Sequence, residues 1–273
     1  MDTKNLTVEE IKNHCSSLEK EVLNLYLQRY TQKQICDRLD VSRGKIDNLV
    51  RKYNLTRFRD RKNYFCKIIN PSKPEFWYFL GLFASDGNLY LKSHCVDTIQ
   101  FILDDLDALE SIKHILECSN PIRVYLRSGK YIYYMSISDT QLVKTVQRIF
   151  NSSCYRKTTT LVFPNVPNID SMKMFLRGFF DGDGSFAKSC REGFYNFKIY
   201  CASEEFTNSL FNVLKTIVPE EKVHLYKNAY IEICSQYGVY LLCKFLYSYN
   251  PDIGIKRKRE RAMQHIENYE LKI

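Results

Sequence analysis

The sequence lacks the patterns that mark zinc-binding, redox, secreted and membrane-spanning proteins. No two of its ten cysteines lie within four positions of each other, which excludes zinc ribbons and CxxC redox motifs. The five histidines are scattered and show no metal-ligand spacing. No apolar N-terminal run is typical of a signal peptide, and no stretch reaches the roughly 18 apolar residues of a membrane span. We therefore expect reduced core cysteines and a cytoplasmic protein that contacts no membrane.

The chain is rich instead in positive charge and aromatic rings. Forty Lys and Arg residues against 31 Asp and Glu residues give a formal net charge of +9, and 20 residues are Tyr. An excess of basic residues suits a polyanionic partner, and aromatic residues interleaved with Lys and Arg are typical of nucleic-acid surfaces. The hydrophobic fraction of 45% is sufficient for one large core or two smaller ones.

Residues 1–55 predict helices without strand alternation. Two short helical patterns between residues 31 and 53 are joined by a tight turn at Asp40 and Val41. This spacing resembles a helix-turn-helix, whose second helix enters the major groove of DNA. The DNA-binding candidates on that second helix are Arg43, Lys45, Asn48 and Arg51. A generic helical hairpin with a solvated charged face is the alternative interpretation.

Residues 56–73 predict a basic linker. Four basic residues crowd between positions 57 and 62, and Pro71 interrupts helix formation. An extended basic connector can lie along DNA phosphates, and a solvated tether is the equally weighted alternative.

The rest of the chain is organised around a stretch that occurs twice, at residues 79–87 and 175–184. In each copy an apolar, helix-like run has a Gly, a small residue four positions later, and then Asp-Gly. Small residues four positions apart share one helix face and let two helices approach closely. Asp86 and Asp183 then fall at helix C-termini, which Gly87 and Gly184 are expected to end.

The position of these two aspartates is electrostatically unfavourable. Each carboxylate faces the negative end of a helix dipole and lies near a second carboxylate. A divalent cation resolves both problems, since hard cations such as Mg²⁺ bind carboxylate oxygens and substrate phosphates. The pattern therefore predicts metal-assisted hydrolysis of phosphodiester bonds. Two ordinary buried helices ending in Asp-Gly turns are the alternative.

Both stretches resemble the LAGLIDADG motif of homing endonucleases, in the single-chain form that has two motifs. The first copy matches at Leu80, Gly81, Asp86 and Gly87, and the second at Leu176, Gly178, Asp181, Asp183 and Gly184. Ala84 and Arg177 depart from the motif. The resemblance covers about residues 74–260, and it implies that Gly81 and Gly178 lie at a helix interface.

The resemblance also implies the catalytic residues and the cofactor. Asp86 and Asp183 would bind Mg²⁺, joined by the backbone carbonyls of Ser85 and Gly182. Two or three Mg²⁺ ions are implied, for which Mn²⁺ substitutes. A lysine from each half would assist near the metals, and the candidates are Lys157 and Lys256, with Lys258 as the alternative to Lys256.

The implied function is site-specific double-strand cleavage of DNA by a monomer, in intron homing. The target would be long and nearly asymmetric, cut across the minor groove with short 3′ overhangs, in a bacterial, phage or other mobile-element setting. A non-cleaving DNA-binding regulator, or an RNA-splicing maturase with intron RNA as its partner, is the alternative. A helical scaffold protein without a nucleic-acid role would leave the basic charge and the doubled motif unexplained.

Two similar halves, 74–166 and 167–273, follow the helix-turn-helix and linker, and the second ends in a basic segment. The hydrophobic period changes to two after each Asp-Gly, so we expect an α+β fold with a duplicated αββαββα unit. Its two antiparallel sheets would pack their apolar faces on helices and form a DNA-binding saddle with their polar faces. The candidates on those faces are Tyr90, Lys92, Gln100, Arg123, Tyr125, Arg127, Lys188, Asn196, Lys198, Tyr200, Lys222, His224 and Tyr226. Solvated sheet faces are the alternative.

Overall fold

The structure is a computed structural model that describes residues 16–27, 30, 32–52, 66–67, 69–90, 97–151, 160–201, 203–226 and 230–272. Lys92, Lys157 and most of the expected linker lie outside these residues. The chain divides into two compact units, Met1–Asn63 and Tyr64–Ile273. Among the described helices, none combines the length and the apolar character needed to cross a membrane.

The described part of the first unit contains three helices around a small core of its own. They are α2 (Ser17–Leu27), α3 (Gln32–Leu39) and α4 (Arg43–Lys52). Three residues separate α3 from α4, and Asp40 adopts a left-handed conformation there, with φ of 49°. Val22, Ile35 and Ile46 are among the apolar residues that pack between the helices. The predicted N-terminal helices are therefore present, and the four candidates on α4 all lie exposed on its surface.

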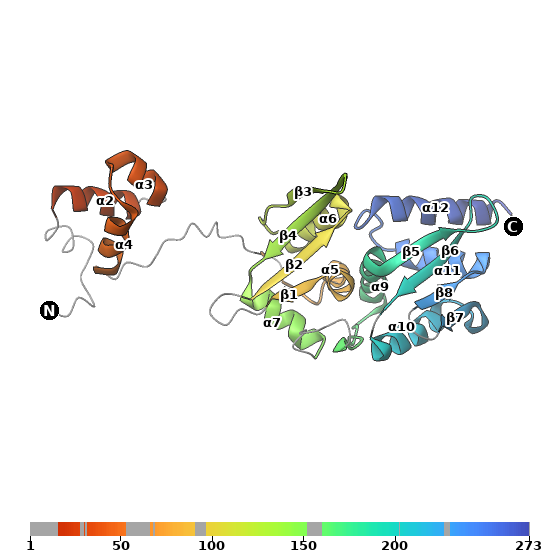
Figure 1. Ribbon diagram of the computed structural model, residues 1–273. Helices are drawn as coiled ribbons and strands as arrows, with labels where there is room; N and C mark the ends of the chain where they lie inside the picture. The colour runs from red at the N-terminus through yellow and green to blue at the C-terminus, as the bar shows by residue number, and fades with distance from the viewer. Residues whose placement is uncertain are drawn as a thin grey trace. The chain divides into compact units, whose positions relative to one another are not determined.

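In the second unit the described residues form two four-stranded antiparallel sheets with helices beside them (Figure 1). The elements of the first half are α5 (Pro74–Ser85), β1 (Asn88–Tyr90), β2 (Thr98–Leu103), α6 (Leu106–Leu116), β3 (Arg123–Arg127), β4 (Lys130–Ile137) and α7 (Thr140–Ile149). Those of the second half are α9 (Ile169–Asp183), β5 (Gly184–Lys188), β6 (Tyr195–Tyr200), α10 (Glu204–Ile217), the short 3₁₀ helix η1 (Glu220–Lys222), β7 (Val223–Tyr226), β8 (Tyr230–Ile233), α11 (Gln236–Tyr247) and α12 (Lys256–Glu270).

The strand order confirms the duplicated α+β fold. The first sheet has the order β1-β2-β4-β3 and the second the order β5-β6-β8-β7, so corresponding strands occupy corresponding places. The basic C-terminal segment forms a helix, α12, which buries Lys258, Ala262 and His265. That helix has no counterpart in the order expected for each half.

Each sheet has one apolar face that packs on helices, because successive strand residues point to opposite sides. In the first sheet Ile99, Phe101 and Met135 are fully buried, and in the second Phe197, Ile231 and Ile233 are buried likewise. All these residues belong to one continuous core that spans both halves. Strand β3 departs from the expected packing of apolar sheet faces on helices, because Val124 and Leu126 at this sheet edge are 53% and 69% exposed.

Candidate active site and nucleic-acid interface

The helices α5 and α9 cross at two glycines, one from each copy of the repeated stretch. A Cβ atom on Gly81 would overlap the carbonyl oxygen of Phe175 and lie 2.7 Å from the amide nitrogen of Phe179. A Cβ atom on Gly178 would overlap the carbonyl oxygen of Tyr78 in the same way. The two backbones are therefore in direct contact, and any side chain at either position would push the helices apart.

The C-terminal ends of α5 and α9 also meet. Asp86 caps α5, and Asp183 is the last residue of α9. A Cβ atom on Gly182 would overlap both the hydroxyl of Ser85 and the carboxylate of Asp86. Asp183 directly follows Gly182, and Gly182 contacts Asp86. The ends of the two helices therefore bring Ser85, Asp86, Gly182 and Asp183 together.

Steric contacts, and not a left-handed backbone conformation, explain why glycine follows each of the two aspartates. Gly184 has φ of −91°, in an extended conformation that any residue can adopt, rather than the left-handed one typical of helix caps. A Cβ atom on Gly184 would overlap the ring of Phe180, and one on Gly87 would lie 2.5 Å from the ring of Phe83. Glycine is required here because the preceding phenylalanine occupies the space.

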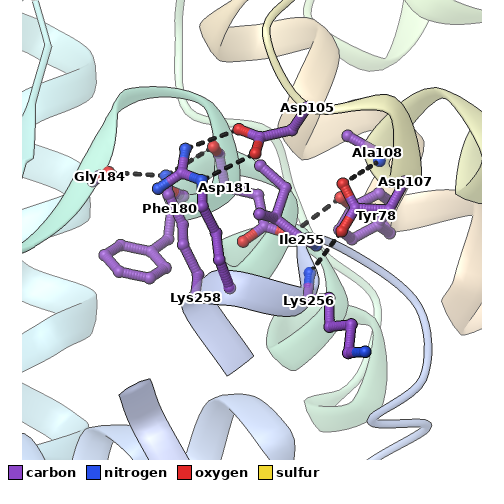
Figure 2. A network of polar contacts seen from close by, with 11 residues as sticks. Tyr78, Asp105, Asp107, Ala108, Phe180, Asp181, Gly184, Ile255, Lys256 and Lys258 are labelled. Atoms are coloured by element: carbon purple, nitrogen blue, oxygen red, sulfur yellow. Dashed lines mark hydrogen bonds and ion pairs between the residues drawn. The ribbon is translucent and has the colours of Figure 1, made fainter. Parts of the chain in front are cut away.

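Lys258 donates hydrogen bonds to backbone carbonyl groups at the C-terminal end of α9. Its buried ammonium donates to the carbonyl oxygens of Phe180, Asp181 and Gly184 at 2.8, 2.6 and 2.7 Å (Figure 2). A cation at this end of a helix is favoured by the dipole. Burial lowers the pKa of Lys258 to about 8, although the negative charge of Asp181 raises this pKa.

Asp181, the other acidic residue of the second motif, is buried and has a structural role. Its Oδ2 accepts hydrogen bonds from the hydroxyl of Tyr78 and the amide of Ile255, both at 2.9 Å. Among the described residues, no group donates to its Oδ1. Burial raises the pKa of Asp181 to about 6, although Lys258 and the two hydrogen bonds lower it. The carboxylate therefore links α5, α9 and the start of α12.

Residues 254–258 connect the second half to helix α6 of the first. The amides of Gly254 and Lys256 donate to Ser111 at 2.9 Å and to Asp107 at 2.6 Å. Arg257 makes two hydrogen bonds to Asp105, at 2.7 and 2.6 Å. We call this segment the C-terminal strap. It leaves the ammonium of Lys256 exposed, 3.8 Å from Glu260, whereas that of Lys258 reaches the turn that bears Asp183.

Arg177, which departs from the motif, is fully buried and holds the end of α11. Its guanidinium donates to the carbonyl oxygens of Tyr249 and Asn250 at 3.1 and 2.7 Å. Burial lowers its pKa from the ordinary value of arginine, against the charge of Asp181. The sequence pattern marked this residue only as a departure, and it gave no indication of a role for Tyr78.

The first sheet places its described DNA-binding candidates on the face opposite the helices. The register pairs Asn88 with Gln100 and Arg123 with Tyr134, and directly paired residues share a face. The candidates on this face are Tyr90, Gln100, Arg123, Tyr125 and Arg127. All of them are exposed except Gln100, which is half-buried.

The second sheet does the same for five of its seven candidates, namely Asn196, Lys198, Tyr200, His224 and Tyr226. The other two lie elsewhere. Lys188 pairs with Tyr195 and shares the side of Phe186 and Phe197, beyond the end of the apolar face. Lys222 ends η1, before β7 begins. Lys188 follows Phe186 by two positions in β5 and therefore shares its face, whereas β7 begins one residue after Lys222.

Residues 170–239 match the family model of the LAGLIDADG-like domain. The homing endonuclease I-WcaI, bound to its DNA recognition sequence, is 12% identical and similar over 78% of this chain and 96% of its own, with a TM-score of 0.51. The LAGLIDADG meganuclease I-AabMI bound to uncleaved DNA is 17% identical over 75% of this chain and 91% of its own (TM-score 0.46). Full-length DUF199/WhiA from Thermatoga maritima is 19% identical over 74% and 63% (TM-score 0.45).

A search of curated proteins finds no match to the sequence. The likeness to I-WcaI extends beyond the residues that the family model matches, and it includes the paired sheets and helices described above. The resemblance indicated by the doubled motif is therefore confirmed: the chain contains a LAGLIDADG-like domain and has the LAGLIDADG fold.

Proposed function

We propose that this protein is a site-specific endonuclease that hydrolyses phosphodiester bonds of double-stranded DNA with divalent cations held by Asp86 and Asp183. The observation that carries the proposal is the contact of Gly182 with Ser85 and Asp86. This contact between the two helix ends, each of which carries an aspartate, supports a site shared by both. A carboxylate at the negative end of a helix gains little from its own helix and is suited to a cation.

The residues at the helix ends fit a hard cation. Glycine at position 182 lets the Ser85 hydroxyl and the Asp86 carboxylate approach the backbone of α9, because a Cβ atom there would overlap both. The three carbonyls that Lys258 engages do not include that of Gly182. The ligands would be the carboxylates of Asp86 and Asp183 with the carbonyls of Ser85 and Gly182. Bound Mg²⁺ or Mn²⁺ would activate water and neutralise charge on the phosphate.

The surfaces beside this site suit a duplex. Each sheet presents an open face with Arg, Lys, Gln or Asn side chains, which pair with purine edges in the major groove. The surface residues Arg43, Lys45, Asn48 and Arg51 of α4 would add contacts outside the sheets. Both halves belong to one chain, so a monomer would supply both aspartates.

Selection and cleavage of a randomised double-stranded DNA library would test the proposal. We expect the protein to cut one long sequence with Mg²⁺ and to bind it without cutting with Ca²⁺. Asp86→Asn and Asp183→Asn should abolish cutting and retain binding. Asp252→Asn is the control, because that carboxylate is 90% exposed and pairs with Arg259 away from the helix ends, so this variant should cut normally.

Other outcomes would redirect the assignment. Retention of one DNA sequence without cleavage in any metal would favour a DNA-binding regulator. Failure to bind duplex DNA, together with binding to a structured intron RNA, would favour a maturase. Undiminished cutting by Asp183→Asn would contradict the proposed metal site.

A further inference from the structure

On the open face of each sheet, directly paired residues of neighbouring strands form a row of side chains. The two rows occupy corresponding places in the two sheets. Both rows begin two residues after an aspartate of the candidate site, at Asn88 in β1 and at Ser185 in β5. In the first sheet the register continues from Asn88 through Gln100 to Ser136. In the second sheet it continues from Ser185 through Lys198 and Glu232 to His224. Gln100 and Lys198 therefore hold equivalent positions in the two halves.

The chemistry of these two positions differs. The row of Gln100 contains amide and hydroxyl groups only, which both donate and accept hydrogen bonds. Lys198 carries an ammonium, which can only donate. In the major groove guanine presents two acceptors, O6 and N7, whereas adenine presents the acceptor N7 and the donor N6. An ammonium is thus matched to guanine, and a glutamine amide to adenine.

Neighbouring residues fix the position of the Lys198 ammonium. It lies 2.9 Å from Oε1 of Glu232, whose side chain is only 9% exposed, and 5.3 Å from the centre of the Tyr230 ring. Tyr226 stacks on Tyr230 with 4.7 Å between the ring centres, so two aromatic rings lie beside the Lys198–Glu232 ion pair. The ion pair with Glu232 restrains the Lys198 ammonium. The Lys198 side chain is nevertheless 28% exposed, so the ammonium is accessible to a partner. Glu232 is too covered to reach a base and acts as a positioning residue.

We infer that Gln100 and Lys198 determine the specificity of the proposed DNA recognition, by reading adenine and guanine at corresponding positions of the two half-sites. The inference rests on the proposed function. The substrate is accordingly a duplex whose two halves differ at the base pairs nearest the helix ends, with an A·T pair on the side of the first sheet and a G·C pair on the side of the second.

Binding selection from a randomised duplex library in Ca²⁺ tests this inference without requiring cleavage. For Lys198→Gln we expect the preferred base at one position to change from guanine to adenine, by a factor of about five or more, with the other positions unchanged. Gln100→Lys should produce the opposite change at the corresponding position of the other half-site. Lys215→Gln is the matched control, because Lys215 also pairs with a glutamate at 2.9 Å but lies on helix α10, and it should leave the selected sequence unaltered.

A further variant covers the case in which Lys198→Gln does not fold, as judged by circular dichroism. Glu232→Gln should weaken the guanine preference at that same position, because the ammonium no longer has its charged partner. A wild-type protein that selects and cuts one sequence, with Lys198→Gln or Glu232→Gln selecting that sequence unchanged, would overturn the inference and leave the proposed function intact. A wild-type protein that selects no duplex at all would overturn both.

Discussion

At the scale of single residues, the second motif divides its two acidic groups between different tasks. Asp183 is the last residue of α9, where we propose a metal site, whereas Asp181 is buried and accepts hydrogen bonds from Tyr78 and Ile255. Lys258 interacts with both regions of this helix end. Its ammonium donates hydrogen bonds to backbone carbonyl oxygens of the turn, and it is attracted by the charge of Asp181. We therefore expect a change in the charge of Lys258 or Asp181 to alter the structure at the C-terminal end of α9.

Replacing Lys258 should therefore destabilise the protein strongly. Lys258→Met leaves three carbonyl oxygens without their donor and removes a positive charge that faces Asp181, so we expect the free energy of unfolding to fall by about 3 kcal/mol or more. Urea unfolding would measure the decrease. Lys256→Met is the matched control, because that side chain is 70% exposed and should change stability by less than about 0.5 kcal/mol. Equal stability of the two variants would contradict the assigned role.

The raised pKa of Asp181 predicts a definite dependence on pH. Its pKa is about 6 in the folded protein, against an ordinary value of 3.8, so the folded state binds the extra proton between these values. Its contribution to stability is fully present below about pH 4 and is lost as the pH rises through 6. Relative to wild type, Asp181→Asn should gain roughly 1–3 kcal/mol over this interval. Unfolding measured at pH 4 and pH 7 would show the gain, and an equal difference from wild type at both pH values would contradict it.

At the scale of elements, the crossing of α5 and α9 sets the distance between the aspartates. Gly178→Ala should destabilise the unit by about 3 kcal/mol or more, since the new Cβ atom meets backbone atoms of Tyr78 and Leu82 that cannot move separately. Gly44→Ala in α4 is a matched control, because its Cβ atom would meet nothing within 4 Å and should favour that helix slightly. Thermal unfolding of both variants would decide, and a stable Gly178→Ala protein would refute the close approach of the two backbones.

The elements near the motif were predictable because local patterns determine them. The change from helical to strand periodicity follows directly after Asp86 and Asp183, and the glycine spacing indicates a helix interface without any knowledge of the partner helix. Helix α12 was predicted only as a basic segment, because its buried face contains Lys258 and His265 rather than an apolar stripe. The interactions of Asp181 and Lys258 could not be predicted, since each joins residues more than 70 positions apart.

At the scale of the whole molecule, the two compact units have separate cores, and their contributions to DNA binding should be separable. The core of residues 64–273 is continuous across both halves, and the C-terminal strap ties α6 to α9 within it. The helices of residues 1–63 have their own apolar cluster. Neither described core requires residues from the other unit, so removing the first unit should leave the second folded.

This separation leads to a prediction about affinity and salt. The isolated 64–273 unit should still cut the selected target, but its Kd should rise by about 10-fold or more, because two linked binding modules gain affinity from their connection. Each phosphate that was neutralised by the first unit alone should reduce the slope of log K against log salt by about 0.9 once that unit is removed. Titrations at several salt concentrations would measure both effects. In the full chain, Arg51→Ala should produce a smaller change in the same direction, and an unchanged Kd and salt slope in the truncated protein would exclude the first unit from the DNA interface.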